Sequence, residues 1–219
     1  MKKLFHYVHC PFCLRVRMAC GILGITYESH VTPYDDEQTP IQLTGKKMLP
    51  IWEDKTGAIN ESLDIISRLD TSKRFKAELQ NTDQIKEMDN LLNKLAGPLF
   101  KLAMPYFVWT PEFDENSRKY FLEKKEAKRG PFTELLKNRA TYEDDFFKIL
   151  GNDVIPDIKN FYKSDKLRLW DIMLSSHLWG LYLVPELRVD QKLHDYLQRV
   201  KAETEFNYVE DYTSDKFWH

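Results

Sequence analysis

Two cysteines separated by two residues are the most chemically distinctive feature of the sequence, in the segment Cys10-Pro11-Phe12-Cys13. A thiol must be ionised to attack a disulfide, and a free cysteine has a pKa of about 8.5. A helix that begins at this motif would point unpaired main-chain N–H groups and the positive end of its dipole at the Cys10 sulfur. Pro11 suits the first helical position, where no N–H is needed. The spacing therefore predicts thiol–disulfide chemistry, with Cys10 as the attacking thiolate and Cys13 as the resolving thiol.

Two other interpretations of this cysteine pair stay open. A Cys-x-x-Cys segment is also half of a zinc site, but no second pair of Cys or His stands at ligand spacing, so we expect no metal. The pair could also be chemically inert. The third cysteine, Cys20, lies seven residues after Cys13 on the same expected helix. We expect it to be a small buried apolar residue rather than a third redox partner.

The elements that would position the motif alternate between strand and helix. Strand patterns occur at 3–8, 26–31, 49–53 and 58–59, and helical patterns at 13–23, 39–44 and 60–70. In the first helix Leu14, Met18 and Ile22 form one apolar face, while Arg15 and Arg17 face elsewhere. The order βαβαββα, with a right-handed crossover between the parallel strands, predicts a small α/β domain.

The pattern changes after this region. Residues 71–82 are polar, carry no strong periodicity and are expected to form a linker. Apolar side chains then recur at steps of three and four from Ile85 to Leu102, which predicts a long helix whose start is capped by Asn81 with Gln84. Further helices are expected near 114–129, 131–150, 170–184 and 190–204. We therefore expect one domain over residues 1–72 and an all-helical domain over residues 83–219.

The composition is typical of a globular protein. Of the 219 residues, 42% are hydrophobic and 30% are charged, and the formal net charge is -2. Because Lys and Arg are spread along the chain, no nucleic-acid surface is expected. The longest apolar segment, 170–184, is shorter than the ~20 residues that cross a bilayer, and the N-terminus lacks the apolar core of a signal peptide. We expect a cytoplasmic protein without membrane attachment, in a compartment where thiols stay reduced.

A second set of residues could bind an extended peptide that carries a free amino-acid end. Met48-Leu49-Pro50 opens a strand, and a cis bond before Pro50 would leave the main chain of Leu49 free to pair with a peptide. Glu61-Ser62 begins a helix, whose N–H groups and the Ser62 hydroxyl can hold a carboxylate. The Glu61 carboxylate can pair with an adjacent ammonium. This combination matches the γ-glutamyl end of glutathione, and an ordinary capped helix start is the alternative.

Five other residues have two possible roles. Lys46 and Lys47 are either solvated loop residues or contacts to the glycine carboxylate of glutathione. Trp109, Trp170 and Trp179 are expected in the core or at the domain interface rather than stacked on a ligand.

With these motifs in this order, the sequence resembles the glutaredoxin 2 family. The resemblance rests on Tyr7-Val8-His9-Cys10-Pro11-Phe12-Cys13, Leu49-Pro50-Ile51, Glu61-Ser62-Leu63-Asp64-Ile65 and Tyr120-Phe121-Leu122-Glu123-Lys124-Lys125-Glu126. It implies an α/β thioredoxin-like N-terminal domain and an all-α glutathione-transferase-like C-terminal domain. It also implies that Cys10 attacks, that Cys13 resolves, and that glutathione is bound by Leu49, Glu61 and Ser62 next to Pro50.

The implied function is that of a dithiol glutaredoxin, a glutathione-dependent thiol–disulfide oxidoreductase. Glutathione would be its co-substrate, disulfide-containing or glutathionylated proteins its partners, and a monomer its expected state. One alternative is a cysteine-type glutathione transferase or dehydroascorbate reductase of the omega sort. Such enzymes need a single reactive cysteine, so Cys13 favours the dithiol route. Another is a non-catalytic interaction module, although members of that kind tend to lose the cysteine.

The chain departs from the family pattern in two places. Phe12 stands where glutaredoxins often carry Tyr, so any role of that hydroxyl is absent. Transferase-like helical domains often place Ser or Thr three residues before an Asp at the start of the core helix, but here Arg168 precedes Asp171. We expect Ser164 or Asp165 to cap that helix instead.

Overall fold

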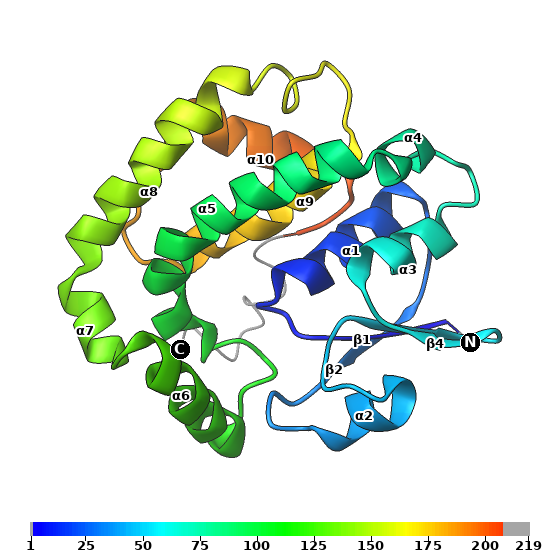
Figure 1. Cartoon of the computed structure of the whole chain (residues 1–219), viewed down its shortest axis with the longest axis horizontal. Coiled ribbons are helices and arrows are strands. Elements are labelled where there is room, and N and C mark those ends of the chain that lie inside the picture. The colour runs from blue at the N-terminus through cyan, green and yellow to red at the C-terminus, as the bar shows by residue number, and fades with distance from the viewer. Residues whose placement is uncertain (1, 208–219) are drawn as a thin grey trace.

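The computed structural model describes residues 2–207 and has a small part with a sheet beside a larger helical part (Figure 1). The first part contains β1 (Lys3–His6), α1 (Pro11–Ile22), β2 (Glu28–Val31), α2 (Gln38–Thr44), β3 (Ile51–Asp54), β4 (Gly57–Ile59) and α3 (Ser62–Leu69). The second contains α4 (Lys76–Gln80), α5 (Thr82–Phe107), α6 (Glu115–Arg129), α7 (Phe132–Lys137), α8 (Arg139–Asp153), η1 (Ile155–Asp157), α9 (Leu169–Leu178), η2 (Trp179–Leu183) and α10 (Gln191–Glu203). Met1 and residues 208–219, the latter part of the expected helical domain, lie outside the described residues.

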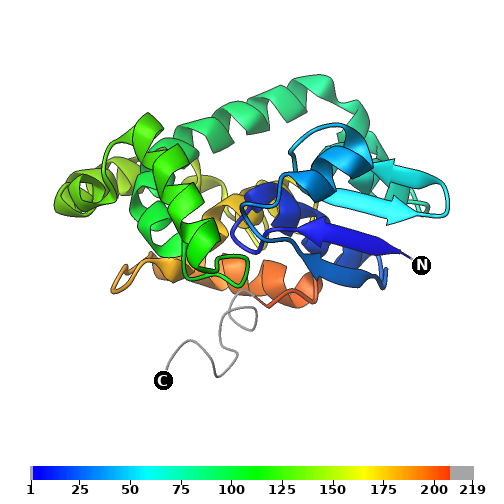
Figure 2. The ribbon, with the colours of Figure 1, turned by 90° about the horizontal axis from the view of Figure 1, so that it is seen from below.

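The sheet has four strands in the order β2-β1-β3-β4. Strand β1 pairs in parallel with β2 and antiparallel with β3, which in turn pairs antiparallel with β4. Leu4 lies opposite Trp52 in this register, and both side chains are fully buried. The predicted order βαβαββα is therefore confirmed. Figure 2 shows these strands, in blue and cyan, at one end of the molecule and the green helices α6 to α8 at the other.

The helix that carries the cysteine motif, α1, is buried on nearly every side. Eight of its twelve residues are buried, among them Arg15, which the sequence pattern placed away from the apolar face. The reason is that α1 packs against α3 of its own part and against α9 of the helical part. At its end, Gly21 lies so close to the main chain of Thr204 that no Cβ fits between them. The prediction of a one-sided amphipathic helix is thus wrong, because the second covering helix is distant in the sequence.

The long helix α5 crosses the helical part and packs against α8 and α9 (Figure 1). Its predicted cap is confirmed, since the Asn81 side chain accepts the main-chain N–H of Gln84 at 3.1 Å. The single helix expected over residues 131–150 is instead two helices, α7 and α8. They meet at Asn138, whose side-chain amide donates to the carbonyl of Glu134 at 2.8 Å and so satisfies a carbonyl at the end of α7.

The expected linker over residues 71–82 is partly helical, because it contains α4. Phe75 is 1% exposed and belongs to the main apolar core. The carboxylate of Asp70 accepts the main-chain N–H groups of Arg74 and Phe75 at 2.8 and 2.7 Å. One buried aromatic side chain therefore anchors a segment whose polar composition had predicted a linker.

The start of α9 also differs from the expectation. The Asp171 carboxylate accepts the Arg168 main-chain N–H at 2.8 Å and the Tyr196 hydroxyl at 3.0 Å. No side chain at the N-cap position caps the helix, and Ser164 accepts an N–H within its own loop. The prediction that Ser164 or Asp165 caps α9 is wrong, because Arg168 is the N-cap residue and its main-chain N–H donates to Asp171. No helix in residues 2–207 has the length and apolar character needed to span a bilayer.

Candidate active site

Cys10 occupies the N-cap position of α1 in an extended conformation, and Pro11 is the first helical residue. The Cys10 carbonyl accepts the first helical hydrogen bond, from the N–H of Leu14 at 3.0 Å. The Cys10 side chain is partly exposed, whereas Cys13 is fully buried and its sulfur accepts the main-chain N–H of Tyr7 at 3.4 Å. One thiol of the pair is therefore open to an incoming disulfide and the other is shielded.

The two thiols have opposite electrostatic environments. A hydrogen bond from Cys13, the charge of His9 and main-chain N–H groups at the helix start lower the pKa of Cys10 to about 7, although burial opposes this. Burial, together with the neighbouring Cys10, raises the pKa of Cys13 well above its ordinary value. Burial also raises the pKa of Cys20 to about 12, and its side chain is buried as expected. Only Cys10 is thus ionised to a large extent near neutral pH.

The loop before β3 lies against the cysteines. The peptide bond between Leu49 and Pro50 is cis, as the sequence predicted. Leu49, Cys13 and Ile51 form a small apolar cluster of their own, with Cys10 packed at its edge. The structure therefore brings the predicted residues Cys10, Cys13 and Leu49 together.

Glu61 and Ser62 stand at the start of α3, as predicted. Glu61 is exposed and has a φ of 69°, an uncommon conformation for a residue with a side chain, of the kind that clusters at functional sites. Ser62 is buried, and its hydroxyl already accepts a hydrogen bond from Nη1 of Arg15 at 3.2 Å. No ion pair to the Glu61 carboxylate is found in residues 2–207. The α3 start thus offers N–H groups and a carboxylate that has no counter-ion in the described part of the chain.

His9 and Glu112 form a contact that the sequence analysis did not find. Oε1 of Glu112 accepts the main-chain N–H of His9 at 3.0 Å and lies 2.5 Å from Nδ1 of the same residue. The two residues are 103 positions apart, and Glu112 lies in the segment between α5 and α6. No local pattern marks Glu112, so the sequence offered no signal for this pair.

The His9 ring is enclosed by aromatic side chains from both parts of the chain. Its ring neighbours, with centroids 5.1 to 5.9 Å away, are Tyr7, Tyr34, Phe107, Phe113 and Phe121. The main-chain N–H of Tyr34 also donates to the carbonyl of Glu112 at 3.0 Å. The residue before Cys10 is therefore held at the interface between the sheet part and the helical part.

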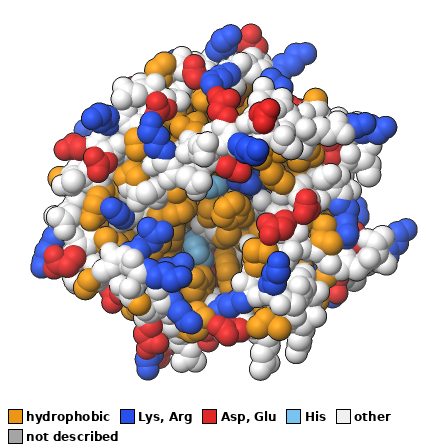
Figure 3. Space-filling view, in the orientation of Figure 1, with side chains coloured by type: hydrophobic (Ala, Val, Ile, Leu, Met, Phe, Trp, Pro, Cys, Tyr) orange, Lys and Arg blue, Asp and Glu red, His pale blue; other side chains and the backbone are white. Residues whose placement is uncertain are grey.

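Figure 3 shows a hollow at the centre of the face where the two parts meet, with hydrophobic and histidine side chains on its floor and Lys and Arg side chains along its border near α6. Lys125 of α6 is close enough for its charge to interact with Cys10. Lys47 is no solvated loop residue, since its ammonium lies 2.7 Å from the Tyr120 hydroxyl and 3.2 Å from Glu37. Lys46 is exposed.

Of the three tryptophans for which a position was predicted, two lie where expected. Trp170 and Trp179 are buried in the core. Trp109 is 58% exposed, with the guanidinium of Arg118 5.0 Å above its ring, so the prediction of a position in the core or at the domain interface is wrong there. It lies just after α5, in a segment where no helix face determines burial.

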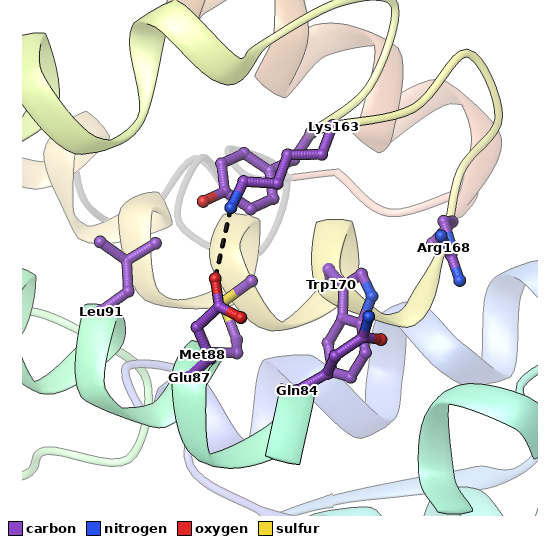
Figure 4. A pocket seen from close by; sticks show the side chains of 8 residues that line it. Gln84, Glu87, Met88, Leu91, Lys163, Arg168 and Trp170 are labelled. Atoms are coloured by element: carbon purple, nitrogen blue, oxygen red, sulfur yellow. Dashed lines mark hydrogen bonds and ion pairs between the residues drawn. The ribbon is translucent and has the colours of Figure 1, made fainter. Parts of the chain in front are cut away.

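A separate pocket of about 200 Å³ lies between α5 and the residues around the start of α9 (Figure 4). Its charged side chains are paired with protein groups, for example Lys163 with Glu87 at 3.4 Å and Arg168 with Glu78 at 3.1 Å. It contains no cysteine and is lined by no residue of the cysteine motif. Across residues 2–207, no three His, Cys, Asp or Glu side chains are grouped as metal ligands.

The fold and the site define a class of protein: a thioredoxin-like domain with a Cys-x-x-Cys helix start and a cis-proline loop, joined to a transferase-like helical domain. The family Glutaredoxin 2, C terminal domain, matches residues 84–212, and the family Glutathione S-transferase, N-terminal domain, matches residues 9–72. Glutaredoxin 2 of Escherichia coli K12 is 33% identical over 214 residues, which cover 94% of this chain and 96% of that protein. The chain belongs to the glutaredoxin 2 family.

Solved structures agree with this assignment. Glutaredoxin 2 from Salmonella typhimurium, solved in complex with glutathione, is 29% identical and superposes with a TM-score of 0.81, covering 96% of this chain and 97% of that one. A glutathione transferase from Phanerochaete chrysosporium has a TM-score of 0.72 at 16% identity, covering 94% of this chain and 98% of that one. The transferase shows the shared fold alone. The expected fold class, a thioredoxin-like domain with a transferase-like helical domain, is confirmed.

Proposed function

We propose that this protein is a dithiol glutaredoxin, which uses glutathione to reduce protein disulfides and glutathione mixed disulfides. The observation that carries the proposal is the contrast between the two thiols at the start of α1. Cys10 is partly exposed with a lowered pKa, and Cys13 is buried with a raised pKa. This is the arrangement that an attacking and a resolving thiol require.

The reaction follows from these two sulfurs. The Cys10 thiolate attacks one sulfur of the substrate disulfide, the substrate S–S bond breaks, and the other sulfur leaves as a thiolate. Cys13 loses its proton to solvent and attacks the Cys10 sulfur of the mixed disulfide, which releases the reduced substrate and leaves a Cys10–Cys13 disulfide. Two molecules of glutathione then reduce this disulfide and are released as oxidised glutathione, so two electrons pass from glutathione to the substrate.

Glutathione binding is proposed for the surface next to the motif. The main chain of Leu49, before the cis bond to Pro50, would pair with the extended tripeptide. The α3 start at Ser62 would hold the γ-glutamyl carboxylate, and Glu61 would pair with its ammonium. The Salmonella typhimurium relative, which was solved with glutathione, supports a glutathione site in this family.

The test compares two substrates in two variants. Cys10→Ser should abolish activity on both a protein disulfide and a glutathione mixed disulfide. Cys13→Ser should lose activity on the protein disulfide and keep activity on the glutathione mixed disulfide, which needs only one thiol. Full activity of Cys13→Ser on both would favour the omega-type transferase or dehydroascorbate reductase. A wild-type protein inactive on both would favour an interaction module.

The remaining assignments are proposals of the same kind. We propose a thioredoxin-like domain over residues 1–72 and a helical domain over residues 83–219, acting as a monomer in the cytoplasm. The physiological partners would be disulfide-containing or glutathionylated proteins. Sedimentation equilibrium tests the monomeric state, and a dimer would contradict it.

A further inference from the structure

A buried carboxylate from the helical part reaches the residue that precedes the attacking cysteine. The Glu112 side chain is fully buried, and a single oxygen, Oε1, accepts both the main-chain N–H and Nδ1–H of His9. Because an ionised carboxylate oxygen can only accept, the hydrogen of this contact is on Nδ1. The second oxygen, Oε2, is buried and has no hydrogen-bond partner among residues 2–207. His9 is therefore the sole hydrogen-bonding side chain that the described structure provides to this carboxylate.

A buried charge is costly unless it is paired, so this arrangement is informative. Burial raises the pKa of Glu112, but the hydrogen bonds and charge of His9 outweigh it and bring the pKa below its ordinary value. The ionised carboxylate and the imidazole then form a dipole whose positive end is His9. Positive charge on His9 is one of the factors that lower the pKa of Cys10.

We propose that Glu112 is a positioning residue for the redox thiol, which fixes the tautomer, orientation and charge of His9 so that the helical part stabilises the Cys10 thiolate. This inference rests on the proposed role of Cys10 as the attacking thiol. It gives the helical part a share in the chemistry of a motif that lies wholly in the sheet part. Glu112 acts through His9, since its own negative charge would by itself disfavour the thiolate.

Other groups also influence this thiol and have to be separated from Glu112. The titratable side chains that interact with Cys10 are Tyr7, Cys13, Arg15, Tyr34 and Lys125. His177 lies against Phe12 of the motif. Burial raises the pKa of Tyr7 and Tyr34, so both are neutral, and burial keeps His177 neutral by lowering its pKa to about 3. Arg15 and Lys125 are cationic in every variant considered below, so their influence is constant.

The experiment measures the ionisation of Cys10 in the Cys13→Ser background, by thiolate absorbance and by the rate of alkylation across pH. Glu112→Gln keeps the shape and the acceptor oxygen but removes the charge. We expect its Cys10 midpoint to rise by about one pH unit, so that alkylation near pH 6 becomes about tenfold slower. The matched control is Ser117→Ala, which removes a hydrogen bond between Ser117 and Asp35 across the same interface and should leave the midpoint unchanged.

A second background decides whether Glu112 acts through His9. His9→Asn retains a donor near the Nδ1 position but carries no charge. In that background Glu112→Gln should leave the Cys10 midpoint unchanged or lower it, because only direct repulsion by Glu112 is removed. An equal rise in both backgrounds, or no rise in either, overturns the inference. A wild-type midpoint at an ordinary cysteine value would instead overturn the role of Cys10 itself.

A measurement on the unmutated protein protects the test against variants that do not fold. The imidazole nitrogen chemical shifts of His9 report whether Nδ1 carries a hydrogen. We expect a protonated Nδ1 throughout the pH range in which Cys10 ionises. An unprotonated Nδ1 in the folded wild-type protein would overturn the inference without any substitution.

Discussion

At the scale of single residues, the reactivity of each cysteine depends on whether water and hydrogen-bond donors reach its sulfur. Cys10 has the Cys13 thiol, helix N–H groups and His9 as favourable neighbours, so its pKa is about 7. It should therefore lose its proton, and its reactivity towards iodoacetamide should rise, as the pH increases from about 6 to about 8. Cys13 and Cys20 should stay unlabelled over this range, because burial raises the pKa of both.

Mass spectrometry of peptides after brief labelling checks this order. Cys20 is the internal control, since it lies on the same helix and is buried. Preferential labelling of Cys13 at the acidic end would reverse the roles assigned to the two thiols.

The second residue-scale prediction concerns Glu61. Glu61→Gln removes the charge that should pair with the ammonium of glutathione and keeps the shape of the side chain. A charge-assisted hydrogen bond is worth roughly 1.5–3 kcal/mol, so the affinity for glutathione should fall by about ten- to a hundredfold. Calorimetric titration with glutathione measures this loss. The control Glu53→Gln removes a charge from β3, where Glu53 pairs with Lys3 at 3.4 Å, and should leave binding unchanged.

A substrate without a γ-glutamyl group separates binding from chemistry. The attack of Cys10 on a small synthetic disulfide should be the same in Glu61→Gln and wild type, because the thiol and the helix start are untouched. An equal loss with both substrates would show that Glu61 maintains the fold rather than binding the ligand.

The site residues that could be predicted from the sequence are those whose roles depend on neighbouring residues in the chain. The roles expected of Cys10 and Cys13 depend on a motif of four consecutive residues at the start of a helix. The cis bond at Pro50 depends on an X-Pro pair. The contact between His9 and Glu112 could not be predicted, because it joins positions 103 residues apart with no motif at the second. The hydrogen bond from Arg15 to Ser62 was missed for the same reason.

At the scale of elements, the two parts approach each other closely at the end of α1. Gly21→Ala would place a methyl group against the main chain of Thr204, which follows α10 and cannot move as a side chain can. Overpacking of this kind typically costs about 1–3 kcal/mol, and we expect a decrease of at least that size in the free energy of unfolding. Urea denaturation followed by circular dichroism measures it.

The matched control is another helical glycine. Gly151 lies in α8, where an added Cβ meets nothing within 4 Å. Because alanine favours helices over glycine by about 1 kcal/mol, Gly151→Ala should stabilise the protein slightly. A similar change in both variants would mean that Gly21 does not mark a close packing contact.

The element boundaries show what periodicity alone can predict. The long apolar repeat of α5 and its Asn81 cap are predicted correctly, because both are patterns within one continuous segment of the sequence. The break between α7 and α8 at Asn138 was missed, since helical periodicity continues across it. The anchoring of α4 was missed because a single aromatic side chain, Phe75, carries no periodic signal.

At the scale of the whole molecule, the two parts share one apolar core. Buried residues from β1, α1 and α3 belong to the same cluster as those of α5, α8 and α9. A fragment that ends near Lys76 would therefore expose the face of α1 that α9 covers. We expect it to be poorly soluble or much less stable than the full chain. Thermal unfolding and gel filtration test this, and a fully stable, active fragment would show that the helical part is an independent module.

The buried histidine of α9 should make the whole protein sensitive to acid. Burial lowers the pKa of His177 to about 3, from an ordinary value of 6.5. Below about pH 6.5 the unfolded state therefore binds a proton at His177 that the folded state does not bind. The contribution of neutral His177 to the free energy of unfolding is thus present above about pH 6.5 and is lost as the pH falls. Between about pH 7 and pH 5 the free energy of unfolding should fall by about 2 kcal/mol because of this residue.

His177→Asn should reduce this acid dependence. Asparagine can keep the donor to the Met173 carbonyl, which His177 Nδ1 contacts at 3.1 Å, but it does not titrate. Urea denaturation at the two pH values gives the comparison, with His194→Asn as the partly exposed control. An unchanged pH dependence in His177→Asn would assign the acid sensitivity to other groups.

The position of α1 between its own sheet and a distant helix also matters while the chain is being made. The ribosome delivers the N-terminal part first, and domains generally fold as units in that order. Here one face of α1 is covered by Leu169–Leu178 and its end lies against Thr204, so its final surroundings exist only after most of the chain has emerged. The cysteine motif is thus translated before α9 and Thr204, which complete its surroundings, and until they emerge the nascent chain carries a site that lacks these contacts.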